Sequence, residues 1–299
     1  MTRVSAYFGL AQPLQFVDVH VDRDNLLFLD PSMIRMCRKS DPLAGRAHDQ
    51  LVGFMSEVTH LRACVRADAQ ARGLELLQHL HEPNETRLGM SRHGVGGHGF
   101  GAGLGERLWE ELRTNVACRA AALTRLEDLA LFIDDVGDDL VSDMTTRVIF
   151  NVLVEFTRQM MLQFPALTVG ATIERVEVWD PTRTAWTTSD VQLPYAAGRQ
   201  LLLVPKRWVF WRTVMDPDAF YNRFGTATVQ AERTTYKDGQ RYAPPKWSLR
   251  EEFPNIKKLN RTQAAKYKQA GEDLVVQYRN QVDQRFAPLA DSELDRRTA

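Results

Sequence analysis

A glycine-dense segment divides this chain and limits what either side of it can form. Seven of the 18 glycines lie within the 12 residues 94–105, directly before the helical pattern of residues 106–112. Glycine tolerates positive φ and lets the backbone approach another group closely, but ordering it costs conformational entropy. No helix or strand periodicity runs through residues 83–103, so we predict a long loop there. Such a loop in a compact domain is usually functional or disordered.

The length and composition are those of a globular protein with one large domain or two moderate ones. The chain has 299 residues, of which 44% are hydrophobic and 25% charged. It has neither an apolar run long enough to span a membrane nor an apolar leader segment. Cys37, Cys64 and Cys118 lack the spacing of a disulfide framework or a zinc cluster. We therefore expect a cytoplasmic protein without a membrane span, and leave its oligomeric state open.

Local patterns predict an α+β fold: a helical N-terminal half with a small hairpin, then a mostly antiparallel sheet region and a C-terminal helix. The apolar-rich segments 14–21 and 25–30 predict the small hairpin. Helical spacing occurs in four segments, namely 43–81, 106–113, 117–131 and 144–164. The last of these carries an apolar stripe at i, i+4 spacing, which is typical of a buried helix.

After Pro165 the pattern changes to strands. Segments 173–179 and 185–193 alternate around a turn at 180–183, which predicts an antiparallel hairpin. The short apolar run 201–204 predicts a buried strand. Further helices are expected over residues 216–224 and 262–286. We divide the chain into parts 1–165 and 166–299, which form two domains or one continuous domain.

Charge is divided unevenly although the formal net charge is zero. Residues 1–204 hold 20 Lys and Arg against 26 Asp and Glu, whereas the remainder holds 18 against 12. The basic C-terminal third either faces an anionic partner or complements the acidic part internally. Residues 205–268 also interleave aromatic side chains with the basic ones. Of these aromatics, we expect Trp208, Phe210 and Phe220 to lie in the core.

Three of the remaining aromatic residues of this region, those that follow no regular pattern, predict a nucleic-acid contact. They are Tyr236, Tyr242 and Trp247, which lie close in sequence to Arg233, Lys237, Arg241 and Lys246. Positive charge attracts phosphates, and aromatic faces stack on unpaired bases. We therefore assign Arg241 and Lys246 as candidate phosphate-binding residues and expect nucleic acid as a partner.

An acidic turn precedes the helix predicted at 144–164. It carries five carboxylates, from Asp134, Asp135, Asp138, Asp139 and Asp143. Clustered carboxylates repel one another unless a cation or an arginine lies among them, and oxygen ligands of this kind suit Mg²⁺. We interpret Asp139 and Asp143 as Mg²⁺ ligands. The alternative is a solvated turn in which Asp143 caps the helix and pairs with Arg147.

Charged residues flank the glycine-dense segment on its N-terminal side. Glu85 is interpreted as a further metal ligand or a base, because it adds a carboxylate to the segment that leads into the glycine-dense residues. The candidate phosphate-binding residues are Arg87, Arg92, His93, Gly97 and Gly99, since basic side chains beside exposed N–H groups suit an anion. Neither a Walker nor a dinucleotide spacing is present. The alternative is a mobile linker.

A lysine closes the predicted strand at 201–204. Restriction-type nucleases present a cation to the scissile phosphate in this way, with the lysine two residues after an acid. Here Val204 occupies that acidic position. We interpret Lys206 as the group that stabilises developing charge on phosphate, or alternatively as a surface lysine. The predicted catalytic set is thus Glu85, Asp139, Asp143 and Lys206.

Three short motifs resemble a pattern in uncharacterised bacterial proteins that are associated with restriction and phage-defence loci. They are Gly-Asp-Asp-Leu-Val-Ser-Asp at 137–143, Asn-Glu to Leu-Gly over 84–89, and Leu-Leu-Val-Pro-Lys at 202–206. The resemblance covers residues 14–215 in the order of elements and carries no catalytic residue over. We predict a Mg²⁺-dependent phosphodiester hydrolase of a bacterial defence system. The alternative is a non-catalytic subunit that binds nucleic acid or a protein partner from the same operon.

Overall fold

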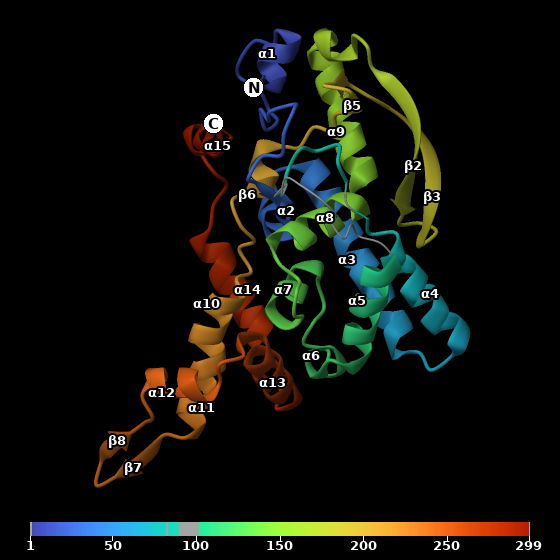
Figure 1. The fold of residues 1–299 in the computed structure, drawn as a ribbon. Helices are drawn as coiled ribbons and strands as arrows, with labels where there is room; N and C mark the ends of the chain where they lie inside the picture. The colour runs from blue at the N-terminus through green and yellow to red at the C-terminus, as the bar shows by residue number, and fades with distance from the viewer. Residues whose placement is uncertain (1, 82, 90–101, 299) are drawn as a thin grey trace.

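The computed structural model describes residues 2–81, 83–89 and 102–298, and its elements form a mixed fold in which helices predominate (Figure 1). The predicted α+β class is confirmed. Helices fill most of the N-terminal half, and the small sheets are antiparallel. No helix in the described ranges is both long and apolar enough to cross a membrane.

The N-terminal half is built from helices, two of which begin with an aspartate cap followed by proline. In chain order the helices are α1 (Val4–Phe8), α2 (Pro31–Cys37), α3 (Pro42–Ala63), α4 (Ala67–Gln78), α5 (Ala102–Thr114), α6 (Val116–Arg119), η1 (Leu126–Asp128), α7 (Leu129–Phe132), α8 (Asp138–Val148), α9 (Phe150–Gln163) and η2 (Pro165–Thr168). Asp30 and Asp41 accept hydrogen bonds from the first N–H groups of α2 and α3, each followed by proline at the first helical position. The helices predicted within 43–81 are confirmed as α3 and α4.

The helix predicted at 144–164 is in fact two helices. The chain bends at Ile149, whose φ of −102° and ψ of 19° fall outside the helical range and separate α8 from α9. Both helices bury apolar side chains, including Val148 and Leu153. The apolar stripe therefore predicted burial correctly. The break could not be predicted, because no proline or glycine lies within residues 144–164.

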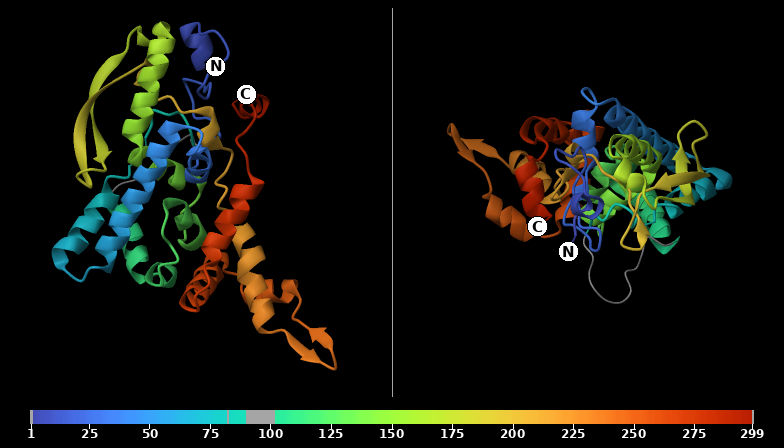
Figure 2. Two further views of the ribbon diagram at one scale, coloured as in Figure 1. Left: turned by 180° about the vertical axis from the view of Figure 1, so that it is seen from behind. Right: turned by 90° about the horizontal axis from the view of Figure 1, so that it is seen from above.

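Strands β2 (Thr172–Asp180) and β3 (Ala185–Leu193) form the predicted antiparallel hairpin. Its turn is fixed by Asp180, whose Oδ1 accepts hydrogen bonds from the N–H groups of residues 182 and 183. Trp179 and Trp186 lie opposite each other in the register and both pack edge-on against Phe54 of α3. The hairpin lies beside α9 in both side views (Figures 1 and 2).

Two other strand predictions are wrong. Segments 14–21 and 25–30 do not form a hairpin, because β1 (Phe28–Leu29) pairs with β6 (Val209–Phe210) from the far half of the chain. Residues 201–204 are buried and extended, yet they belong to no sheet. Their N–H groups bond instead to separate acceptors, the carbonyls of Pro194 and Glu85 and the hydroxyl of Thr157. In both segments the backbone hydrogen bonds go to residues outside the expected hairpin or sheet, and a local sequence pattern does not encode these partners.

The C-terminal part adds a small hairpin and further helices. Its elements, with the short pieces before it, are β4 (Tyr195–Ala196), β5 (Arg199–Gln200), η3 (Lys206–Trp208), α10 (Pro217–Phe220), the π-helical turn η4 (Tyr221–Gly225), α11 (Thr226–Glu232), β7 (Thr235–Lys237), β8 (Gln240–Tyr242), α12 (Lys246–Glu252), α13 (Ile256–Gln269), α14 (Leu274–Arg285) and α15 (Asp291–Arg297). The helix predicted at 216–224 is confirmed and longer. The one predicted at 262–286 breaks at Gly271, which has a φ of 89°.

One buried apolar cluster extends from Val4 to Leu294 and crosses the boundary that the sequence suggested at residue 165. It contains Trp208, Phe210 and Phe220, as predicted. A second, small cluster underlies α11 and α12. The β7–β8 hairpin projects from that end of the molecule, opposite the β2–β3 hairpin (Figures 1 and 2).

Candidate functional site

Two residues of segment 83–89, Glu85 and Gly89, lie near α8. Asp139, Asp143 and Arg147 follow one another at four-residue spacing and therefore share one face of α8. A Cβ added to Gly89 would lie 2.7 Å from Asp139 Oδ1. At the other end, the charge of Glu85 acts on the Arg147 guanidinium. We call Glu85, Gly89, Asp139, Asp143 and Arg147 the α8 seam.

Arg147 is the buried end of the α8 seam. Its side chain is 2% exposed, and Nη2 donates a hydrogen bond of 3.0 Å to the carbonyl of Glu177 on β2. The guanidinium lies 5.1 Å from the centroid of the Phe150 ring. Its Nε has no hydrogen-bond partner among the described residues. Burial lowers the pKa of Arg147, while Glu85 and Glu177 act in the opposite direction.

Two histidines extend the polar cluster beside Arg147. His79 Nδ1 lies 3.1 Å from Glu177 Oε2, and His79 Nε2 lies 3.1 Å from Glu75 Oε1. His81 Nε2 is 3.9 Å from the same Glu177 oxygen. The sequence shows the His-x-His pair, but it gives no signal that a strand almost a hundred residues later supplies the carboxylate.

The predicted Mg²⁺ ligands are brought onto the α8 seam without a ready metal centre. Asp139 and Asp143 each already take part in a polar or electrostatic interaction. Within the described ranges, no group of three or more His, Cys, Asp or Glu side chains is placed to hold a metal ion. Asp143 also does not cap a helix, because α8 begins at Asp138 and places Asp143 inside it. The Mg²⁺ site therefore stays a prediction.

Arg87 has a structural position that contradicts its predicted role in phosphate binding. It is 1% exposed; its Nε donates to the Val21 carbonyl at 3.1 Å and its Nη1 donates to the Asn84 carbonyl. Its own carbonyl accepts hydrogen bonds from the main chain and side chain of Asn25. Burial lowers the pKa of Arg87 to about 10. Nε and Nη1 of the guanidinium thus hold segment 83–89 against the N-terminal segment, whereas Nη2 has no hydrogen-bond partner among the described residues.

Lys206 does not join the other predicted catalytic residues. Its side chain is 17% exposed, and Nζ lies 3.0 Å from Asp291 Oδ1 of α15. It lines a hollow of about 420 Å³ with Arg3, Asp18 and Asp295, and no residue of the α8 seam lines that hollow. The predicted set therefore separates: Glu85, Asp139 and Asp143 share the α8 seam, whereas Lys206 pairs with the C-terminal helix.

The last glycines of the glycine-dense segment are helical. Gly103 and Gly105 belong to α5, and a Cβ added to Gly105 would lie 3.0 Å from the backbone of Gln78 in α4. Gly105 therefore permits close helix packing, which the loop prediction did not include. The other predicted phosphate-binding residues of this region, Arg92, His93, Gly97 and Gly99, lie outside the described residues.

The basic and aromatic group predicted to contact nucleic acid is exposed on a projecting hairpin. We call residues 235–247 the arm. All residues of β7 and β8 are exposed, with Tyr236 at 72% and Tyr242 at 51%, and Trp247 follows at 64%. Lys237 and Arg241 have no ion-pair partner in the described chain.

Two of the predicted cations, Arg233 beside the arm and Lys246 within it, form bonds with the rest of the fold. Arg233 forms a two-pronged ion pair with Glu252, at 2.5 and 2.6 Å. Lys246 Nζ donates to the Asn222 carbonyl at 3.1 Å. Lys246 is therefore a weaker candidate for phosphate contact than Arg241, because a ligand would compete with that internal bond.

A family described as Domain of unknown function (DUF8370) matches residues 10–216. The chain belongs to this family. No curated protein and no solved structure matches the chain. The DUF8370 region contains the whole α8 seam and ends just before α10, so the arm lies in the part that follows it.

Proposed function

We propose that this protein binds single-stranded nucleic acid through the arm. The observation that carries the proposal is the exposure of Tyr236 and Tyr242 on the hairpin that carries Lys237 and Arg241, two cations without ion-pair partners among the described residues; Trp247 is also exposed, at the start of α12. Exposed aromatic rings contribute nothing to the core, so a contiguous group of them indicates an interaction surface.

The register of the hairpin pairs an aromatic side chain with a cation on one face, and places a tyrosine and a lysine on the other face without pairing them directly. Tyr236 lies directly opposite Arg241, so these two share one face. Tyr242 and Lys237 lie on the other face, because side chains alternate along a strand. A base stacked on either tyrosine would place its phosphate near a positive charge, which is how sequence-tolerant single-strand binding works.

The experiment is fluorescence anisotropy with labelled DNA and RNA homopolymers about 20 nucleotides long, long enough for one site. We expect saturable binding, and Tyr236→Ala together with Tyr242→Ala should weaken it by at least about tenfold, since each stacked base contributes roughly 1–3 kcal/mol. Tyr7→Ala is the matched control, because Tyr7 is 48% exposed but lies on α1. Absence of binding, or equal affinity in the arm variant and the control, would overturn the proposal.

A phosphodiester hydrolase at the α8 seam is the second candidate function. It is favoured by one observation: Glu85 and two aspartates of α8 share the seam with the buried Arg147. The test is Mg²⁺-dependent degradation of plasmid DNA and total RNA by the purified protein. Asp139→Asn with Asp143→Asn should abolish it, whereas Glu174→Gln, an exposed carboxylate on β2, should not. Cleavage retained by the double variant would exclude this candidate.

A further inference from the structure

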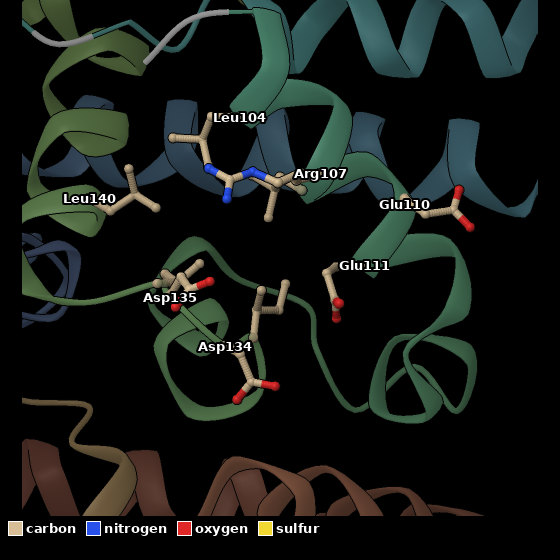
Figure 3. Close-up of a pocket in the computed structure, with 10 residues that line it drawn as sticks. Leu104, Arg107, Glu110, Glu111, Asp134, Asp135 and Leu140 are labelled. Atoms are coloured by element: carbon tan, nitrogen blue, oxygen red, sulfur yellow. The ribbon is translucent and has the colours of Figure 1, made fainter. Parts of the chain in front are cut away.

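A pocket of about 240 Å³ lies between α5 and the turn that joins α7 to α8 (Figure 3). Its floor consists of Leu108, Ile133 and Val136, which are 2%, 2% and 3% exposed. Leu104 and Leu140 add partly exposed apolar walls. The volume is below the roughly 300–1,000 Å³ of pockets for drug-sized ligands, so a matching ligand is a small one.

Carboxylates dominate the rim of this pocket. The charged lining residues are Arg107, Glu110, Glu111, Asp134 and Asp135. Of the acids, Asp134 pairs with Arg261 of α13, and Glu110 pairs with Arg113. Glu111 and Asp135 have no ion-pair partner in the part of the chain that the structure describes. They come from α5 and from the turn, so they approach the pocket from two separate elements.

The basic residue behind the turn, Lys257, forms no ion pair with Glu111 or Asp135 among the described residues, although the charge of Asp135 acts on it. Lys257 Nζ donates to the carbonyls of Ile133 and Val136, at 2.7 and 2.8 Å, and so holds the turn from the side of α13. Burial lowers the pKa of Lys257, while Asp134 and Asp135 raise it. These bonds fix the shape of the turn, and a fixed site loses less entropy when it binds a ligand.

We propose that this pocket binds a small primary amine with a compact apolar body. The body would cover the leucine, isoleucine and valine floor and remove apolar surface from water. The ammonium group would donate hydrogen bonds to Glu111 and Asp135, and such charge-assisted bonds are roughly twice as strong as neutral ones.

The lining also selects among amines. Figure 3 shows the Arg107 side chain toward Leu104 and Leu140, whereas Asp134 and Glu111 lie on the opposite side of the pocket. A second positive group placed beside these leucines would therefore meet the guanidinium, so the pocket disfavours an amine that carries a further charge on its apolar body. The same acidic rim repels phosphate, which separates this site from the nucleic-acid contact proposed for the arm.

Calorimetric titration with phenethylamine tests the proposal. We expect saturable binding to one site, and none by 3-phenylpropionate, which has the same ring but the opposite charge. Asp135→Asn and Glu111→Gln should each weaken phenethylamine binding by about tenfold. Asparagine accepts the positive φ of 65° at position 135, so that variant keeps the turn. Glu106→Gln, on an exposed position of α5 outside the pocket lining, should bind as the wild type does.

Thermal melting of each variant separates loss of the site from loss of the fold. A folded Asp135→Asn or Glu111→Gln protein with unchanged affinity would overturn the proposal. The absence of saturable binding, or equal binding of 3-phenylpropionate, would overturn it as well. Binding of nucleic acid by the arm is measured separately and does not depend on this outcome.

Discussion

Asp30 joins three backbone N–H groups through one buried carboxylate. Oδ1 accepts hydrogen bonds from Ser32 and Met33 at 2.6 and 3.2 Å, and Oδ2 accepts one from Val214 at 2.7 Å. The residue is 1% exposed, and burial raises its pKa to about 6, although the three hydrogen bonds act to lower it. One side chain thus starts α2 and fixes the chain that leaves β6.

This raised pKa predicts a pH dependence of stability. The ordinary pKa of the carboxyl is 3.8, so between that value and about 6 the folded state binds more protons than the unfolded state. The contribution of Asp30 to the free energy of unfolding is therefore full below the unfolded pKa and is lost as the pH rises through the folded pKa. The stability deficit of Asp30→Asn, measured by urea denaturation, should be about 1 kcal/mol larger at about pH 5 than at about pH 7. A deficit that is equal or smaller at the lower pH contradicts this.

Arg87 gives the second prediction at this scale. Arg87→Lys keeps the positive charge but cannot donate to both Val21 and Asn84 in the same geometry. We expect the free energy of unfolding to fall by about 1–3 kcal/mol, while affinity for single-stranded nucleic acid stays unchanged. Arg183→Lys, at a side chain that is 75% exposed, is the control for the substitution itself. A stable variant with weakened nucleic-acid binding would restore the phosphate-binding role.

At the scale of elements, glycine sets how closely α4 and α5 pack. A Cβ on Gly73 would lie 2.1 Å from the Trp109 ring, whereas a Cβ on Gly53 of α3 meets nothing within 4 Å. Gly73→Ala should therefore destabilise the protein by about 1–3 kcal/mol through overpacking. Gly53→Ala should instead stabilise it by roughly 0.5–1 kcal/mol, because alanine is the better helix former. Thermal or urea unfolding measures both, and a neutral Gly73→Ala would mean that Trp109 moves freely.

The arm makes a prediction about salt. Lys237 and Arg241 are its cations without ion-pair partners in the ranges that the structure describes, so we expect them to contribute to binding by release of counterions from phosphate. Lys237→Gln with Arg241→Gln should reduce the slope of log K against log salt by about 1.4, at roughly 0.7 for each single-strand phosphate contact. Arg233→Gln should change it less, because Arg233 pairs with Glu252. An unchanged slope in the double variant would place the phosphate contacts elsewhere.

What the sequence could predict follows the range of the interactions. The β2–β3 hairpin is specified by alternation and a turn within about twenty residues, and helices α3 and α4 by local spacing and caps. Residues 201–204 read as a strand because they are apolar, but distant acceptors decide their backbone bonds. In the candidate site, Asp139 and Asp143 share one face of α8 because of their four-residue spacing, which is local. Glu177 and the Lys206–Asp291 pair depend on contacts between remote segments.

At the scale of the whole molecule, buried ion pairs join the C-terminal helices to the DUF8370 region. Arg35 of α2 contacts Glu127 of η1 and lies 2.6 Å from Asp283 of α14. Arg279 of α14 lies 2.7 Å from Asp128, which is fully buried. Burial would raise the pKa of Glu127, but Arg35 and Arg279 outweigh it and lower the pKa. The acids of η1 therefore need α14 in place, although α14 lies beyond residue 216.

This dependence predicts that both regions unfold together. Arg279→Met removes the cation from buried Asp128 and should lower the free energy of unfolding by about 3–5 kcal/mol, the usual effect of breaking one side of a buried pair. Hydrogen exchange should show equal loss of protection in α3 and α14, and circular dichroism should show one transition. Arg296→Met is the matched control, since this arginine is exposed and pairs with Glu293 at the surface, so its replacement should cost about 0–1 kcal/mol. If α14 lost protection while α3 kept it, the C-terminal helices would be a separate unit, and the boundary of the cooperative fold would lie near residue 216.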